Sequence, residues 1–73
     1  MDISEAIKQI RTSLGLSQMI FAQKLHVSFS TVNRWENGKV TPNRLATVAI
    51  IAFAREYNVD EVLLENLKGL YCF

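Results

Sequence analysis

Four residues between positions 29 and 34 have side chains suited to molecular recognition: Phe29, Ser30, Asn33 and Arg34. On a helix that turns by about 100° per residue, they fall within one arc of about 140°. The guanidinium fork, the amide and the hydroxyl offer hydrogen-bond donors and acceptors in defined directions. The first member of the arc is an exposed aromatic ring, which a merely solvated helix face does not need. The arc therefore predicts a surface that faces a binding partner.

The opposite side of the same predicted helix is apolar. Val32 and Trp35 lie three residues apart, which brings them onto one stripe of the helix. Trp35 is the only tryptophan of the chain. We expect it to lie in the core and to anchor the helix, with its indole N–H near the edge where an acceptor is available.

Catalysis is not expected from this composition. The chain has one histidine, His26, and one cysteine, Cys72, far apart in the sequence. There is no glycine-rich phosphate loop, no metal-ligand spacing and no nucleophile motif. The carboxylates are scattered in a way that suits helix caps and surface pairs. We therefore expect no enzymatic activity, no cofactor and no metal.

The charges are distributed unevenly along the chain. The net charge is +1, but residues 6–55 contain seven lysines and arginines against Glu36 alone. Residues 56–73 contain four acids against Lys68. Two explanations stay open: a chance fluctuation in a short chain, or an anion-facing surface with an acidic end turned elsewhere.

The size of the chain predicts one small domain, residues 1–73. Apolar residues make up 49% of it, which argues against disorder. A single cysteine cannot form an internal disulfide, so a reducing cytoplasm is the expected location. The first residues do not resemble a signal peptide. The longest apolar run, Val48 to Ala54, is far shorter than the ~20 residues that span a bilayer. We expect a soluble cytoplasmic protein.

The spacing of apolar residues predicts helices only, because no segment alternates as a strand does. The first helix carries a stripe of Ile3, Ile7, Ile10 and Leu14 and ends before Gly15. Ser17 is the predicted cap of a second helix, 18–25, whose apolar side is Phe21, Ala22 and Leu25. His26 and Val27 break the pattern. A third helix is expected from Ser28 to about Asn37, closed by Gly38.

Two further helices are predicted towards the C-terminus. Thr41 and Pro42 have the types expected at the cap and first position of a fourth helix. Its expected buried face is Leu45, Val48, Ala49, Ala52 and Phe53. Asn58 can supply a left-handed residue after it. Asp60 is the predicted cap of a fifth helix, with Val62, Leu63 and Leu67 as its apolar residues and Gly69 as its end.

The segments "LGLSQMIFAQKL" (14–25) and "VSFSTVNRWENGK" (27–39), followed by Pro42, resemble the phage-repressor and Cro type of helix-turn-helix protein, the XRE family. The resemblance covers about residues 5–67. It implies a compact all-α, five-helix, lambda-repressor-like fold with the helix-turn-helix at about 18–37. It also implies a sequence-specific regulator of transcription, a repressor, which inserts helix 28–37 into the major groove of double-stranded DNA.

The resemblance implies that the arc of Phe29, Ser30, Asn33 and Arg34, here called the recognition arc, contacts DNA bases. Arg34 can donate twice to guanine, and Asn33 can pair with adenine. Ser30 can donate and accept, and Phe29 can lie against a thymine methyl group. Contacts to phosphate are expected from a second set: Gln18, Ser28, Asn37, Lys39 and Arg44.

Arg11 and Glu36 match a pair that in this family joins the first helix to the end of the recognition helix. We expect a structural ion pair, because an unpaired Glu36 would repel DNA phosphates. The chain departs from the family pattern at His26, where relatives usually have glycine in a left-handed turn. Histidine tolerates that backbone better than most residues do, and we expect a turn residue there and no ligand or base. The segment from Pro42 to Tyr57 is also about one turn longer than in short members of the family.

The C-terminal region, about 50–73, is expected to form a homodimer that binds an inverted repeat. The residues assigned to the interface are Ile50, Ile51, Leu64, Leu70, Tyr71 and Phe73. The alternative is that the tail folds back over the chain's own core. An alternative function is also open: an antitoxin or protein-binding module of the same fold that acts through a protein partner.

Overall fold

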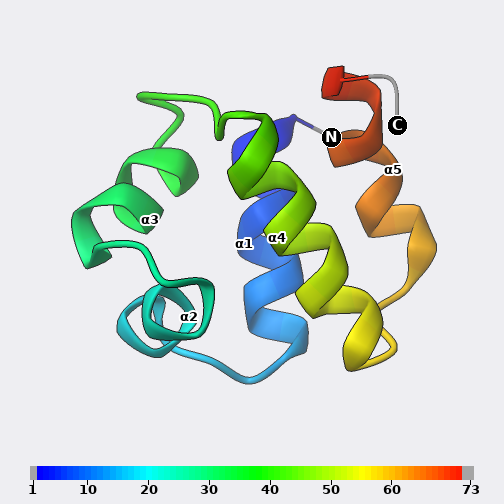
Figure 1. Ribbon diagram of the computed structural model, residues 1–73, viewed down its shortest axis with the longest axis horizontal. Coiled ribbons are helices and arrows are strands. Elements are labelled where there is room, and N and C mark those ends of the chain that lie inside the picture. The colour runs from blue at the N-terminus through cyan, green and yellow to red at the C-terminus, as the bar shows by residue number, and fades with distance from the viewer. Residues whose placement is uncertain (1, 72–73) are drawn as a thin grey trace.

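The computed structural model describes residues 2–71, without the side chain of Tyr71, and all regular secondary structure in this range is helical. The helices follow in the order α1 (Ile3–Ser13), α2 (Gln18–Leu25), α3 (Phe29–Glu36), α4 (Arg44–Glu56) and α5 (Glu61–Tyr71). Figure 1 shows α1 and α4 across the middle of the molecule, with α2 and α3 to one side and α5 to the other. The predicted all-α, five-helix fold is confirmed. No helix within residues 2–71 is long and apolar enough to cross a membrane.

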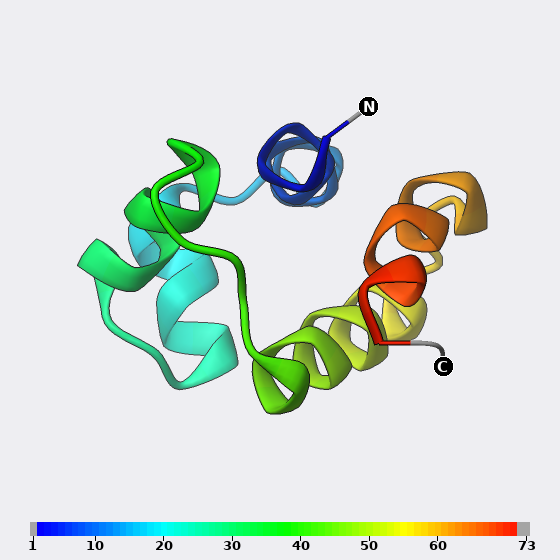
Figure 2. The same cartoon turned by 90° about the horizontal axis from the view of Figure 1, so that it is seen from above.

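All five helices contribute to one buried cluster. Its largest fully buried apolar side chains are Phe21, Ile7, Ile10, Ile50, Leu64, Leu67 and Val32. Seen from above in Figure 2, α2 and α3 lie on one side of α1, and α4 and α5 lie on the other. Helices of this length are marginal alone in water, so this shared packing is what keeps them folded.

The helix starts are fixed by side-chain caps. Ser17 and Ser28 cap α2 and α3 as predicted, each accepting a hydrogen bond from the backbone N–H three residues on. The predicted start of the fourth helix at Thr41 and Pro42 is wrong. Asn43 is the cap, with its Oδ1 accepting from the Ala46 N–H at 2.8 Å. Asparagine is at least as good a cap as threonine, and Pro42 is instead buried before the helix.

Four helices end in the same backbone motif. A left-handed residue follows each of α1, α2, α3 and α4: Gly15, His26, Gly38 and Asn58, with φ between 59° and 72°. After α2, the N–H of His26 donates to the carbonyl of Gln23 and that of Val27 to the carbonyl of Ala22, at 3.2 and 3.0 Å. These paired bonds are the Schellman motif, which satisfies the last carbonyls of a helix. The left-handed turn predicted at His26 is therefore present.

We expect His26→Gly to stabilise the protein by about 0.5–1 kcal/mol. Holding a residue that has a Cβ in the left-handed conformation costs about 1–2 kcal/mol, and glycine removes this cost. Glycine also loses more chain entropy on folding, which offsets about 0.5–1 kcal/mol of that gain. The imidazole is exposed, so its removal sacrifices no core contact. Thermal unfolding followed by circular dichroism checks this. Lys24→Gly, an exposed change inside α2, is the control and should destabilise by about 1 kcal/mol. A loss of stability in His26→Gly would contradict the expectation.

The predicted buried face of α4 is right for Ala49 and Phe53, which pack half-buried against the core, and wrong for its other three residues. Leu45 and Val48 are 80% and 45% exposed, and Ala52 is exposed as well. The buried residues are Thr47, Ile50, Ile51 and Ala54. Helix α4 is apolar on more than one side, so its own periodicity does not select a face. Thr47 can be buried because its hydroxyl donates to the carbonyl of Asn43 at 2.8 Å.

This reversal also corrects the predicted dimer interface. Ile50 and Leu64 are fully buried and Ile51 is 6% exposed, so all three belong to the chain's own core. They cannot contact a second copy without opening that core. Leu70 is half-buried, whereas the side chain of Tyr71 and all of Phe73 lie outside the described residues. Helix α5 also continues through Gly69 to Tyr71, so the predicted end at Gly69 is wrong.

Candidate nucleic-acid interface

Helix α3 lies at the edge of the molecule and packs against α1 and α2 (Figure 1). Its inner stripe is closed, because Val32 is fully buried and Trp35 is 3% exposed. Its outer side presents Phe29, which is 49% exposed, together with exposed Ser30 and Arg34. The placement of Trp35 in the core is therefore confirmed. A rigidly held helix displays an aromatic ring, a hydroxyl and a guanidinium to solvent.

The first turn of α3 is ordered by Ser28. Its Oγ accepts from the Thr31 N–H at 3.2 Å and is hydrogen-bonded to the hydroxyls of Thr31 and Ser30, at 2.8 and 3.2 Å. The hydroxyl that we assigned to phosphate is thus occupied with capping. Ser28 is nevertheless the N-cap of α3, where the free backbone N–H groups and the positive end of the helix dipole can bind a phosphate.

The predicted ion pair between Arg11 and Glu36 is present and is bidentate. Arg11 Nε donates to Glu36 Oε2 at 2.7 Å, and Arg11 Nη2 donates to Glu36 Oε1 at 2.9 Å. Arg11 Nη1 also donates to the carbonyl of Leu16 at 2.8 Å. The two side chains are only 13% and 3% exposed. The hydrogen bonds from Arg11 to Glu36 raise the pKa of Arg11 above its ordinary value, although burial opposes this.

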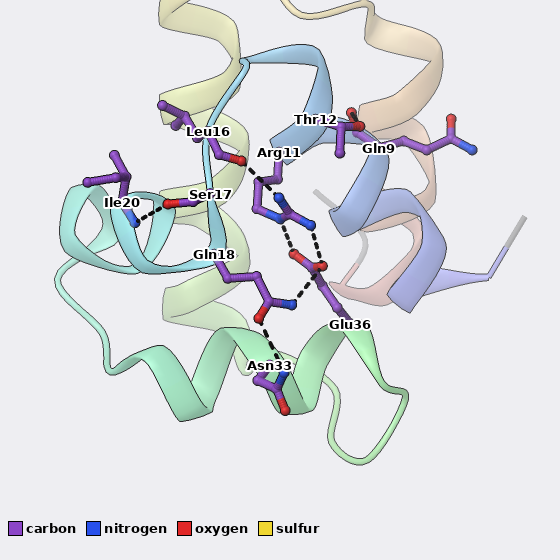
Figure 3. A network of polar contacts seen from close by, with 9 residues as sticks. All are labelled: Gln9, Arg11, Thr12, Leu16, Ser17, Gln18, Ile20, Asn33 and Glu36. Carbon is purple, nitrogen blue, oxygen red and sulfur yellow. Dashed lines mark hydrogen bonds and ion pairs between the residues drawn. The ribbon is translucent and has the colours of Figure 1, made fainter.

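A row of amide side chains extends from this ion pair along α3 (Figure 3). Gln18 Nε2 donates to Glu36 Oε1 at 3.1 Å, and Asn33 Nδ2 donates to Gln18 Oε1 at 3.2 Å. Asn37 Nδ2 donates to Asn33 Oδ1 at 3.0 Å. These bonds join the start of α2 to the last turn and C-cap of α3, through side chains for which the sequence predicts separate contacts to phosphates and bases.

This row of amides was not predicted from the sequence. The contact between Asn33 and Asn37 could have been predicted from the sequence, because residues four apart lie on the same helix face. The contacts of Gln18 could not, since its partners are 15 and 18 residues away and depend on how α2 packs against α3.

The loop after α3 carries further exposed polar groups. Asn37 and Lys39 are exposed, and the Lys39 N–H donates to the carbonyl of Arg34 at 2.9 Å in the turn around Gly38. Arg44 is exposed at the first position of α4. Because Glu36 is the only acid of residues 6–55 and is paired and buried, the surface of this segment is positively charged.

Within residues 2–71 no group of three or more His, Cys, Asp or Glu side chains could hold a metal ion. The outer side of α3, the loop after it and the start of α4 form an exposed cationic surface with hydrogen-bonding side chains. Such a surface can bind a polyanion and contact base edges. The fold and this surface define a helix-turn-helix DNA-binding domain.

Comparison with known families agrees with this class. A helix-turn-helix family model matches residues 7–64, and the chain belongs to that family, the XRE type. The family consists of DNA-binding regulators of transcription. No solved structure matches the chain with significance.

Two curated relatives are regulators by name, and one of them is named a transcriptional activator. The chain is 35% identical over 63 residues to the HTH-type transcriptional activator BcrR of Enterococcus faecalis. It is 29% identical over 63 residues to the propionyl-CoA carboxylase regulator of Cereibacter sphaeroides. Both matches cover 86% of the chain, but only 30% and 13% of the relatives' own lengths. The chain thus corresponds to less than a third of either relative.

Proposed function

We propose that the protein binds a specific double-stranded DNA sequence and regulates transcription, without enzymatic activity and in the cytoplasm. The observation that carries this is the outer side of α3. It exposes Phe29, Ser30 and Arg34, while Val32 and Trp35 hold the helix in the core. A major groove about 12 Å wide accommodates one such helix.

In this proposal the recognition arc reads bases. Arg34 donates to two acceptors of guanine, which is a geometry that the guanidinium fork matches. Asn33 pairs with adenine, Ser30 makes shorter polar contacts, and Phe29 contacts a thymine methyl group.

Phosphate contacts come from the rim of the same surface. Lys39 and Arg44 supply charge, while Gln18, Ser28 and Asn37 supply hydrogen bonds or backbone N–H groups. Two cationic contacts per chain, or four in a dimer, give a slope of about −3.6 for log affinity against log salt concentration.

We propose repression as the direction of control. Occupation of a promoter by the DNA-binding surface is enough to exclude polymerase, whereas activation also needs a surface that recruits it. The relative from Enterococcus faecalis is named an activator, so the direction has to be tested on this chain.

The decisive experiment is selection of bound DNA from a random pool, followed by titration of the selected site at several salt concentrations. One enriched motif and a salt slope near the expected value would support the proposal. A selection without enrichment, or binding that does not weaken with salt, would contradict it.

The second candidate is a protein-binding module of the same fold. The observation that favours it is an apolar strip on α4, made of exposed Leu45, Val48 and Ala52 beside a hollow of about 330 Å³ between α4 and α5. A protein partner would co-purify with the chain and bind it with little salt dependence, which separates this candidate from DNA binding.

We propose that the apolar strip on α4 instead joins two copies of the chain around a two-fold axis. Scattered exposed apolar residues are normal on proteins, but Leu45, Val48 and Ala52 are spaced by three and four residues and so share one side of α4. Exposed apolar residues grouped in this way mark an interaction surface. Helix-turn-helix dimers contact two half-sites about 34 Å apart, so the expected DNA target is an inverted repeat with half-site centres about 10 base pairs apart. This surface replaces the interface residues that the structure buries.

Val48→Arg is expected to convert the dimer to a monomer and to weaken binding to the inverted repeat at least tenfold. Val48 is already 45% exposed, so the new charge is tolerated in the monomer but opposes burial against a second copy. Sedimentation at micromolar concentration gives the oligomeric state. Val62→Arg is the matched control, because Val62 is 65% exposed on α5, away from both the α4 strip and the residues assigned to DNA. A wild-type chain that sediments as a monomer while bound to its full site would contradict the dimer.

A further inference from the structure

The hydrogen bonds that run from Asn37 to Glu36 all point the same way. Asn37 donates to Asn33, Asn33 donates to Gln18, and Gln18 donates to Glu36. An isolated amide pair can exchange donor and acceptor by rotating both groups. Here the row ends on a carboxylate that two nitrogens of Arg11 already hold in place (Figure 3).

The carboxylate determines the direction of the whole row. An ionised Glu36 only accepts hydrogen bonds, so the end of Gln18 that approaches it has to be the NH₂ group. The carbonyl of Gln18 then faces Asn33, which has to present its own NH₂ group. Asn33 Oδ1 is left facing Asn37. One charged group, itself 3% exposed, thereby fixes the orientation of amides along the outer edge of α3.

The row leaves Asn33 with one donor and one acceptor for a ligand. Its NH₂ group has two hydrogens, of which Gln18 takes one, and its carbonyl has two lone pairs, of which Asn37 takes one. The major-groove edge of adenine offers one acceptor, N7, and one donor, the N6 amino group. The unused pair on Asn33 matches that edge, and its order in space is fixed by the row.

We propose that Glu36 is a positioning residue for base recognition. It acts through Gln18 to hold the Asn33 amide in one orientation, and this orientation selects adenine at one base pair of each half-site. The inference rests on the proposed function and adds to it the residue that sets a base preference without contacting DNA. The stabilising ion pair with Arg11 does not by itself require the contact from Gln18.

The Asn33→Ala variant identifies the base pair that Asn33 contacts. It is the position of the selected DNA site at which this variant loses the base preference of the wild type. Gln18→Met then interrupts the row while leaving the Arg11–Glu36 pair intact. We expect discrimination at that base pair to fall from about 30-fold to about twofold or less, since an amide–adenine pair of average strength contributes about 30-fold. Gln23→Met, an exposed change on the same helix, is the matched control and should retain full discrimination.

Two variants of the ion pair separate orientation from structure. Arg11→Met and Glu36→Gln both break the pair, but only Glu36→Gln replaces the carboxylate by an amide that can also donate. We expect Glu36→Gln to lose discrimination at the Asn33 base pair and Arg11→Met to retain it. Circular dichroism verifies folding, and if either variant is unfolded, the comparison of Gln18→Met with Gln23→Met decides.

The outcomes that overturn the inference differ from those that overturn the proposed function. If the wild-type chain enriches no DNA motif, the proposed function fails. If a motif is enriched but Asn33→Ala changes no base preference, the role of Asn33 and Glu36 fails alone. If Gln18→Met weakens binding equally on every sequence, Gln18 acts only on phosphate and the inference is wrong. Equal loss of discrimination in Arg11→Met and Glu36→Gln would give Glu36 a purely structural role.

Discussion

Trp35→Ala should lower the free energy of unfolding by about 3–5 kcal/mol, because truncating a buried tryptophan removes its apolar contacts and leaves a cavity. Trp35 is 3% exposed and lies in the cluster shared by all five helices. A core in a domain of this size supplies only about 3–5 kcal/mol of net stability. Most of the protein should therefore be unfolded at 25 °C. Far-ultraviolet circular dichroism during urea titration measures this directly.

Phe29→Ala is the matched control for Trp35→Ala, since it removes an aromatic ring from the same helix. Phe29 is 49% exposed, so its loss should leave the melting temperature nearly unchanged while it weakens binding to the selected DNA. A Trp35→Ala protein that melts like the wild type but no longer binds DNA would show that the tryptophan serves the interface and not the core.

Arg34→Ala should weaken binding to the selected DNA site by about 1–3 kcal/mol per half-site and relax the preference at one base pair. Arg34 is exposed on the outer side of α3, and its fork can donate to two acceptors of one guanine. Affinity for random DNA should change much less, because random DNA offers phosphates but no matched base edge. Fluorescence anisotropy titrations with both DNAs measure the difference.

Arg55→Ala controls for the loss of one positive charge. Arg55 lies in the last turn of α4, where its Nε donates to Glu61 Oε1 at 3.0 Å, and both side chains are about half exposed. An exposed pair of this kind contributes little stability, so this variant should fold and bind like the wild type. An equal loss of affinity for selected and random DNA in Arg34→Ala would show that Arg34 contacts phosphate alone.

The sequence alone determined the helix-turn-helix. Ser17 and Ser28 are strong caps, and Val32 and Trp35 are the only large apolar residues of α3 apart from the exposed Phe29, so they define a single inward stripe. These signals are local: a cap acts within one turn, and a helix with one apolar stripe can bury only that stripe. The pairing of Arg11 with Glu36 came from the family resemblance, since the two residues are 25 positions apart.

Only the tertiary structure decided which side of α4 is buried and how the amides of the interface are connected. Helix α4 carries apolar residues on several sides, so the choice of Ile50, Ile51 and Ala54 over Leu45 and Val48 depends on which surfaces the other helices offer. The bonds of Gln18 to Glu36 and Asn33 likewise exist only because α1, α2 and α3 converge at one point. Side-chain periodicity describes one helix at a time, whereas burial and hydrogen-bond partners belong to the packing of several.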